Sequence, residues 1–198
     1  MKPGNKPDRF TAKAHKEGFA ARSIYKLEEI DRRLRLVRQG MRVLDLGAAP
    51  GSWTQYLAQK VGGKGAVVAL DLNPLRVAVP AYVQAREMDV LNVPVEEVAA
   101  LGPFDLVVSD MAPHTTGVRD ADVARSVELV ERAVAIADAS LKPGGALLVK
   151  IFQGSGFEEV RALFRARFDE LRIVKPEASR KESIEIYLAG LGRKAPAG

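Results

Sequence analysis

The chain has 198 residues, 47% hydrophobic and 28% charged, a balance typical of one soluble globular domain. It has no cysteine, which excludes disulfides and thiolate metal sites, and its two histidines, His15 and His114, lack metal-ligand spacing. The longest stretch without charged residues covers 14 residues, fewer than the roughly 20 that a membrane span needs. We therefore expect a cytoplasmic protein with no metal, no membrane segment and no secretion signal.

The net charge of +5 is concentrated at the amino end. Residues 1–42 carry 12 Lys and Arg against five Asp and Glu, whereas residues 43–198 carry 18 against 20. A basic segment attracts polyanions, nucleic acid in particular, because phosphate contacts supply most of the sequence-independent affinity. A solvated helix with a frayed tail is the structural alternative.

The amino-terminal segment divides into two parts. Residues 1–19 are rich in Lys, Arg, Pro and Gly without an apolar period, which predicts a flexible basic arm that could contact RNA. Within residues 20–41, apolar side chains recur at spacings of three and four from Ile24 to Leu34, which predicts a basic amphipathic helix. Lys26 lies on the polar face of this helix. That face could bind RNA or could equally be exposed to solvent without a function.

Residues 42–53 predict a strand, a tight turn and the start of a helix. Gly47 and Gly51 lack Cβ, so they can adopt positive φ and let a ligand approach the backbone closely. A dinucleotide-binding fingerprint has glycines spaced Gly-x-Gly-x-x-Gly. Counting from Gly47, this chain has Ala49 and Ser52 at the second and third of these positions, which disfavours NAD as the ligand. The turn followed by Trp53 instead resembles the first motif of S-adenosylmethionine (SAM) dependent methyltransferases, with glycines needed only for packing as the alternative.

Two acids follow the next predicted strands. The strand over 66–70 ends at Asp71, 24 residues after Gly47, where an acid can accept hydrogen bonds from both ribose hydroxyls of an adenosyl ligand. The strand over 82–87 is followed by Asp89, which could bind the exocyclic amine of adenine. Each acid also has a structural alternative to ligand binding. Asp71 could form a turn or cap the next helix, and Asp89 could be an ordinary loop residue.

Strands and helices continue to alternate through the second half. Asp110 and Lys150 stand at the carboxyl ends of two strands, the edge where open α/β sheets collect their active residues. Lys150 could also simply extend from a buried strand to water. Helices are predicted over 94–101, 123–141 and 157–166, and strands over 104–109, 146–151, 171–174 and 183–188.

This order of elements predicts a single methyltransferase domain over 1–198. Its fold class is α/β: a Rossmann-like, doubly wound, mostly parallel seven-stranded sheet with one antiparallel strand. Strands four and five are neighbours in such a sheet, so Asp110 and Lys150 can meet beside the glycine turn. Glu185 lies in the last strand, whose polar and apolar residues alternate.

Several motifs occur together in one order from about Arg22 to Leu188. The motifs are Leu-Asp-Leu-Gly-Ala-Ala-Pro-Gly-Ser-Trp, Ser-Asp-Met-Ala-Pro, Leu-Val-Lys-Ile-Phe-Gln-Gly and Lys-Pro-x-Ala-Ser-Arg-x-x-Ser-x-Glu-x-Tyr. Together they closely resemble the motifs of the FtsJ (RrmJ) family of RNA 2′-O-methyltransferases. The family often has serine where this chain has Ala178.

The resemblance implies a catalytic tetrad with Lys150 as general base. An unperturbed lysine, with a pKa of about 10.4, must be desolvated or placed near another cation to act as a base. Lys26 could be that cation, while Asp110 and Glu185 orient the amines. The resemblance implies two residue sets: Lys26, Asp110, Lys150 and Glu185 as the catalytic tetrad, and Gly51, Trp53, Asp71, Asp89 and Asp110 as the SAM site.

The resemblance also implies a substrate. Short single-domain members with a basic amino end methylate a uridine ribose of large-subunit ribosomal RNA, so we expect a monomer that acts on this RNA within the large ribosomal subunit. The Asp-Met-Ala-Pro stretch after strand four favours oxygen over nitrogen as the acceptor. Three alternatives remain: a tRNA ribose 2′-O-methyltransferase, a non-catalytic RNA-binding ribosome assembly factor, and a small-molecule O-methyltransferase.

Overall fold

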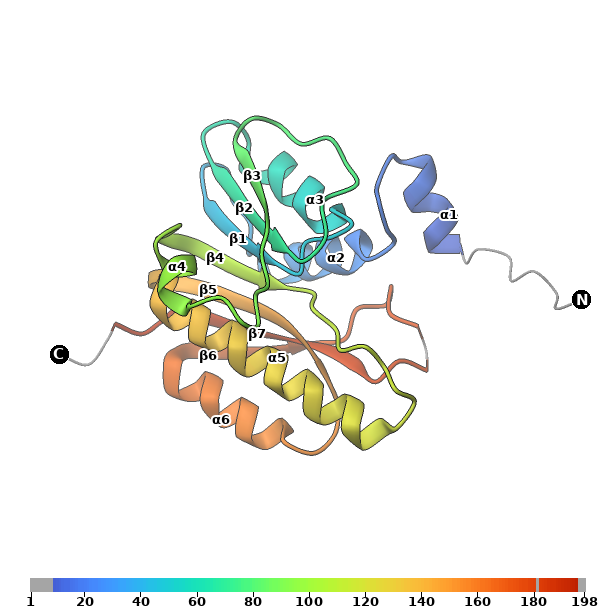
Figure 1. The fold of residues 1–198 in the computed structure, drawn as a ribbon, viewed down its shortest axis with the longest axis vertical. Helices are drawn as coiled ribbons and strands as arrows, with labels where there is room; N and C mark the ends of the chain where they lie inside the picture. Colours follow the sequence, from blue (N-terminus) through green and yellow to red (C-terminus); the bar gives the residue numbers. More distant parts are fainter. Residues whose placement is uncertain (1–8, 181, 196–198) are drawn as a thin grey trace, which may run out of the picture.

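The computed structural model describes residues 9–180 and 182–195, which form seven strands and six helices (Figure 1). The strands are β1 (Arg42–Leu46), β2 (Ala66–Asp71), β3 (Val83–Glu87), β4 (Phe104–Ser109), β5 (Leu141–Phe152), β6 (Phe168–Val174) and β7 (Glu185–Arg193). The helices are α1 (Arg9–Lys16), α2 (Ile24–Leu34), α3 (Ser52–Val61), α4 (Val95–Ala99), α5 (Arg119–Ser140) and α6 (Phe157–Arg167).

The strands form one sheet in the order β3-β2-β1-β4-β5-β7-β6. Neighbouring strands are parallel from β3 through β5, and β7 runs antiparallel to both β5 and β6. The order reverses between β1 and β4, which makes the carboxyl ends of these strands the expected ligand edge of a doubly wound sheet. The predicted α/β fold with one antiparallel strand is therefore confirmed.

Helices cover both faces of the sheet, as Figure 1 shows, and each face has its own apolar core. Successive side chains of a strand point to opposite faces, so Val43 of β1 joins the core under α2 and α3. Leu44 joins the core under α4, α5 and α6. Within the described residues, no helix combines the length and apolar character needed to cross a membrane.

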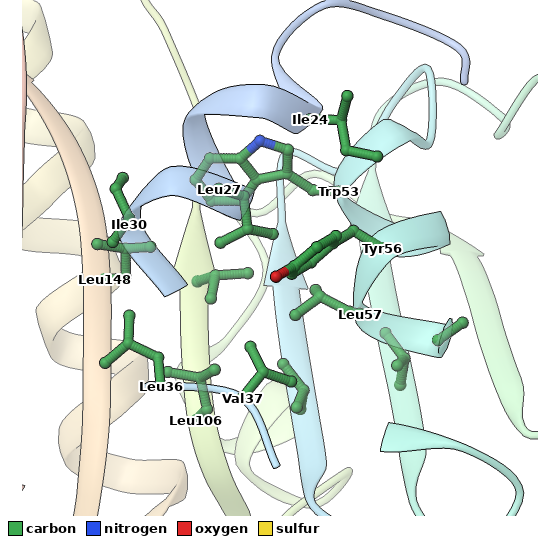
Figure 2. Close-up of a cluster of buried hydrophobic side chains, with 14 of the residues drawn as sticks. Ile24, Leu27, Ile30, Leu36, Val37, Trp53, Tyr56, Leu57, Leu106 and Leu148 are labelled. Carbon is green, nitrogen blue, oxygen red and sulfur yellow. The ribbon is translucent and has the colours of Figure 1, made fainter. Parts of the chain in front are cut away.

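The α2–α3 core fixes the helix that carries Lys26. Figure 2 shows Leu27 of α2 next to Trp53 of α3, and Ile30 of α2 next to Leu148 of β5. Leu27 and Ile30 are completely buried. Because the apolar face of α2 packs into this core, the position of Lys26 relative to the sheet is fixed.

The amino-terminal segment corrects one expectation. Residues 9–16 form helix α1, where the sequence analysis predicted a flexible arm over 1–19; residues 1–8 of that arm lie outside the described part of the chain. The helix is short but it buries Ala14, and the ring of Phe10 lies 5.8 Å from that of Tyr25 on α2. Two apolar contacts in eight residues are too few to predict a helix from periodicity alone.

Several element boundaries also differ from the prediction. Helix α2 ends before the end of the 20–41 segment because Arg35 adopts a left-handed conformation, with φ of 55°, and caps the helix. Strand β5 begins at Leu141 rather than at 146, with a register shift against β4 before Ala146. The Pro-Gly-Gly stretch before the predicted strand is therefore an irregularity within β5.

Candidate active site

The glycine turn after β1 is built around two left-handed residues. Gly47 has φ of 73°, and a Cβ there would lie 2.5 Å from Cγ of Met111. Gly51, which precedes α3, has φ of 116°, and a Cβ there would overlap Cγ2 of Val77. Glycine is required at both positions, for the backbone conformation and for the close approach of neighbouring side chains.

A cavity of about 520 Å³ opens beside this turn. It is lined by Gly47 and by three predicted cofactor ligands, Asp71, Asp89 and Asp110, which follow β2, β3 and β4. Its volume is within the range of small-molecule sites. The parallel sheet thus brings together acids that are far apart in the sequence.

The carboxylate of Asp71 braces the turn. Its Oδ2 accepts the backbone N–H of Ala49 at 3.0 Å, and its Oδ1 accepts the backbone N–H of Asn73 at 2.8 Å. Oδ1 also accepts the side-chain amide of Asn73 at 3.2 Å, whereas Oδ2 keeps a further lone pair. Asp71 can therefore hold the turn and still accept a hydrogen bond from a ligand in the cavity.

Asp89 is held in the same manner on the other side of the cavity. Its carboxylate accepts the side-chain amide of Asn92 at 2.7 Å and the backbone N–H of Leu91 at 3.0 Å. The hydrogen bond from Asn92, followed by the one from Leu91, holds the pKa of Asp89 below its usual range, and burial partly opposes this shift. Asp89 is therefore an oriented anion.

Gly51 and Trp53 are not among the described residues that line the cavity. The Trp53 indole is buried, donates its Nε1–H to the carbonyl of Ser23 at 2.9 Å, and lies 5.9 Å from the ring of Tyr187. In this structure Gly51 shapes the turn and Trp53 joins the start of α2 to α3. Direct contact of either residue with a cofactor stays a prediction.

The first half of the predicted tetrad is an ion pair at the cavity edge. Nζ of Lys150, whose side chain is only 8% exposed, lies 3.0 Å from Oδ1 of Asp110 and also donates to the Asp110 carbonyl. The pairing of β5 with β7 places Lys150 opposite Tyr187 and Phe152 opposite Glu185. The sheet register thus positions the next two polar side chains.

The second half is the pair between Lys26 and Glu185. Nζ of Lys26 lies 2.5 Å from Oε1 of Glu185, and both side chains are 13% exposed. The hydroxyl of Ser179 donates to the same oxygen at 2.9 Å. Helix α2 therefore places the Lys26 ammonium against β7. The four predicted tetrad residues form two ion pairs.

Tyr187 lies two residues after Glu185 on β7 and binds Asp110, and sequence reasoning gave it no role. Its buried hydroxyl donates to Oδ1 of Asp110 at 2.7 Å. Burial, then the nearby carboxylates of Asp110 and Glu185, raise the pKa of Tyr187 well above its usual value. Tyr187 therefore remains a donor, and its alternation with Glu185 in the last strand was the signal that could have found it.

Asp45 is a buried acid beneath the turn. Its Oδ2 accepts the hydroxyl of Thr54 at 2.7 Å, whereas its Oδ1 has no hydrogen-bond partner among the described residues. Burial raises the pKa of Asp45 from 3.8 to about 7, repulsion by Asp110 and Asp71 adds to this shift, and the bond from Thr54 opposes it.

Among the described residues, no acid or histidine cluster is arranged to hold a metal ion.

Residues 19–193 match the profile of FtsJ-like methyltransferases. The chain belongs to the FtsJ-like methyltransferase family. It is 50% identical over 193 residues to a Sorangium cellulosum protein named ribosomal RNA large subunit methyltransferase E, covering 98% of this chain and 91% of the relative. A Nitratidesulfovibrio vulgaris protein of the same name is 48% identical over 188 residues, covering 93% and 94%.

Solved structures share the FtsJ-like fold at lower identity. A crystal structure of a ribosomal RNA methyltransferase from Plasmodium falciparum has a TM-score of 0.77 at 22% identity, covering 88% of this chain and 98% of that one. Fibrillarin from Aeropyrum pernix, crystallised with natively bound SAM, has a TM-score of 0.61 at 16% identity, covering 85% and 76%. These likenesses support the fold.

SAM, the cofactor of this fold, is compatible with the residues present. Its net positive charge complements a cavity lined by Asp71, Asp89 and Asp110. The cavity therefore suits a cationic adenosyl ligand better than an anionic dinucleotide.

Proposed function

We propose that this chain transfers the methyl group of SAM to a ribose 2′-oxygen, that of a uridine, in large-subunit ribosomal RNA, with Lys150 as general base. The observation that carries the proposal is the ion pair of Lys150 with Asp110, a residue that lines the cavity, together with the Lys26–Glu185 pair on β7 and Tyr187, which lies two residues after Glu185 and binds Asp110. The names of the relatives support the substrate. We propose that it acts as a monomer in the cytoplasm.

The reaction requires a base and an oriented acceptor. When bound, SAM supplies a methyl group that its sulfonium already activates, and Asp71, Asp89 and Asp110 would hold it. Lys150 must first give up its ammonium proton; its neutral amine would then take the proton of the 2′-hydroxyl onto Nζ. The ribose oxygen would accept the methyl group, with S-adenosylhomocysteine as the leaving group. Holding the two reactants in one geometry lowers the barrier further.

The neighbours of Lys150 fix where its proton-accepting atom lies. Asp110 binds Nζ through both its carboxylate and its carbonyl, and Tyr187 in turn binds the carboxylate. Lys26, held by Glu185, presents an ammonium that can stabilise negative charge developing on the acceptor oxygen. We therefore propose that the acids and the tyrosine position the lysines, and that the lysines handle the proton and the developing charge.

Transfer of labelled methyl from SAM to three substrates tests this proposal: large ribosomal subunits, free ribosomal RNA and tRNA. We expect label in large-subunit RNA and none in tRNA. Label in tRNA alone would favour the tRNA ribose alternative. Binding of ribosomal RNA without transfer to any substrate would favour an assembly factor.

A further inference from the structure

The segment just before β7 is held along α2 by two long-range contacts. The backbone N–H of Glu177 donates to Oε2 of Glu29 at 2.8 Å, and the guanidinium of Arg22 donates to the carbonyl of Ala178 at 2.5 Å. Glu29 is one turn after Lys26 on α2 and is 7% exposed. The helix that carries Lys26 therefore also binds the segment 177–179, which leads to Glu185.

The next residue of the segment completes a closed ring of contacts. The hydroxyl of Ser179 donates to Oε1 of Glu185 at 2.9 Å, and Nζ of Lys26 lies 2.5 Å from the same oxygen. The ring runs from Lys26 along α2 to Glu29, across to Glu177, along the chain to Ser179, and back through Glu185. Glu185 is thus fixed from both sides.

Packing alone does not explain Glu29, because burying a carboxylate costs free energy. A buried carboxylate loses hydration, and in the described part of the chain its ion pair is with Arg33, whose Nη2 lies 2.5 Å from Oε1. An apolar side chain would avoid this cost, but it could not accept the N–H of Glu177. What the charge adds is a strong, directional attachment of the segment.

We propose that Glu29 and Ser179 are positioning residues that set the geometry of Glu185, and through it the place of the Lys26 ammonium in the active site. This inference rests on the proposed function, in which Lys26 and Glu185 take part. Without Ser179, Glu185 retains Lys26 alone and its side chain gains freedom to rotate. Without Glu29, the segment loses its attachment to α2.

Amide hydrogen exchange tests the attachment without any assay of activity. In the full chain, Glu29→Ala should speed exchange at the Glu177 amide by about tenfold or more, because that hydrogen bond is lost. Glu28→Ala, an exposed neighbour on the same helix, is the matched control and should leave this amide unchanged. Glu29→Gln keeps an acceptor oxygen and should retain part of the protection. Unchanged exchange in Glu29→Ala would overturn the attachment.

A double-mutant cycle tests the link to catalysis. Ser179→Ala should lower kcat about tenfold with an unchanged KM for SAM, since a hydrogen bond to a charged group is lost. Ser179→Thr keeps the hydroxyl and should restore most of kcat, and Glu177→Ala, which removes only an exposed side chain, should leave kcat unchanged. In the Glu185→Ala background, where Ser179 has no carboxylate to bind, Ser179→Ala should cause no further loss.

Additive losses in that cycle, or an equal loss in Ser179→Ala and Ser179→Thr, would overturn the positioning role. An unmodified chain that transfers no methyl group to any RNA would instead reject the proposed function. The exchange measurement distinguishes the two failures, because the attachment of Glu177 to Glu29 is measured without substrate or cofactor.

Discussion

Lys150 is the side chain on which the proposed chemistry depends. Lys150→Ala should lower methyl transfer about 100-fold to 10,000-fold, the range of a lost general base. SAM binding should be retained, because Lys150 is not among the residues that line the cavity in the described chain. Binding and transfer are measured on the same preparation.

Lys142→Ala is the matched control, since Lys142 lies on the same strand but pairs with Asp105 away from the cavity. It should transfer methyl groups at nearly the normal rate. Near-normal transfer by Lys150→Ala would remove Lys150 from the role of base.

The raised pKa of Asp45 predicts a pH-dependent penalty on stability. The pKa is about 7 when folded, against 3.8 ordinarily, so the folded state favours the protonated acid and loses stability as pH rises from about 4 through 7. Asp45→Asn stays neutral and escapes this penalty. From pH 5 to pH 8, its free energy of unfolding should therefore gain about 2 kcal/mol relative to the parent chain.

Urea unfolding at several pH values measures this difference. Asp120→Asn, which replaces an exposed carboxyl at the start of α5, is the control and should show a flat difference. A flat or shrinking difference for Asp45→Asn would contradict a buried acid that titrates near neutrality.

Sequence reasoning identified the residues that meet at the cavity better than those that support them. Asp71, Asp89 and Asp110 could be predicted because each follows a strand of a parallel sheet, and such strand ends converge. Glu29 and Glu177 are 148 positions apart, and their contact involves a backbone N–H that no sequence pattern reveals.

At the scale of the elements, the strand–turn–helix around Gly51 is the most constrained piece. Gly51→Ala should cost about 1–3 kcal/mol of unfolding free energy, because alanine is strained at φ of 116° and its Cβ meets Val77. Gly63→Ala, on a turn with open space around it, is the matched control and should be nearly neutral. Equal stability of the two variants would contradict the strain.

The strands could be predicted from the sequence because β-branched and apolar runs mark them, and β4 occurs where expected. Helix α1 could not, since its formation depends on contacts of Phe10 and Ala14 with α2 rather than on its own periodicity. The irregular start of β5 was also missed, because glycine and proline there indicate a break unless the partner strand β4 is known.

At the scale of the whole molecule, basic residues are concentrated at the end that carries α1 and α2. Lys16→Glu, at an exposed position at the end of α1, should weaken RNA binding and reduce the slope of log affinity against log salt by about 1 or more. Lys64→Glu makes the same charge change in the α3–β2 turn, away from the cavity, and should have a smaller effect. Equal effects would contradict a localised RNA surface.

In the proposed mechanism, the ion pairs Lys150–Asp110 and Lys26–Glu185 activate a ribose oxygen. The most direct measurement is the position of the transferred methyl group, found by digesting labelled large-subunit RNA to nucleosides and identifying the labelled one by mass spectrometry. We expect 2′-O-methyluridine, with the label lost in Lys150→Ala. Label on a base carbon or nitrogen would contradict the account.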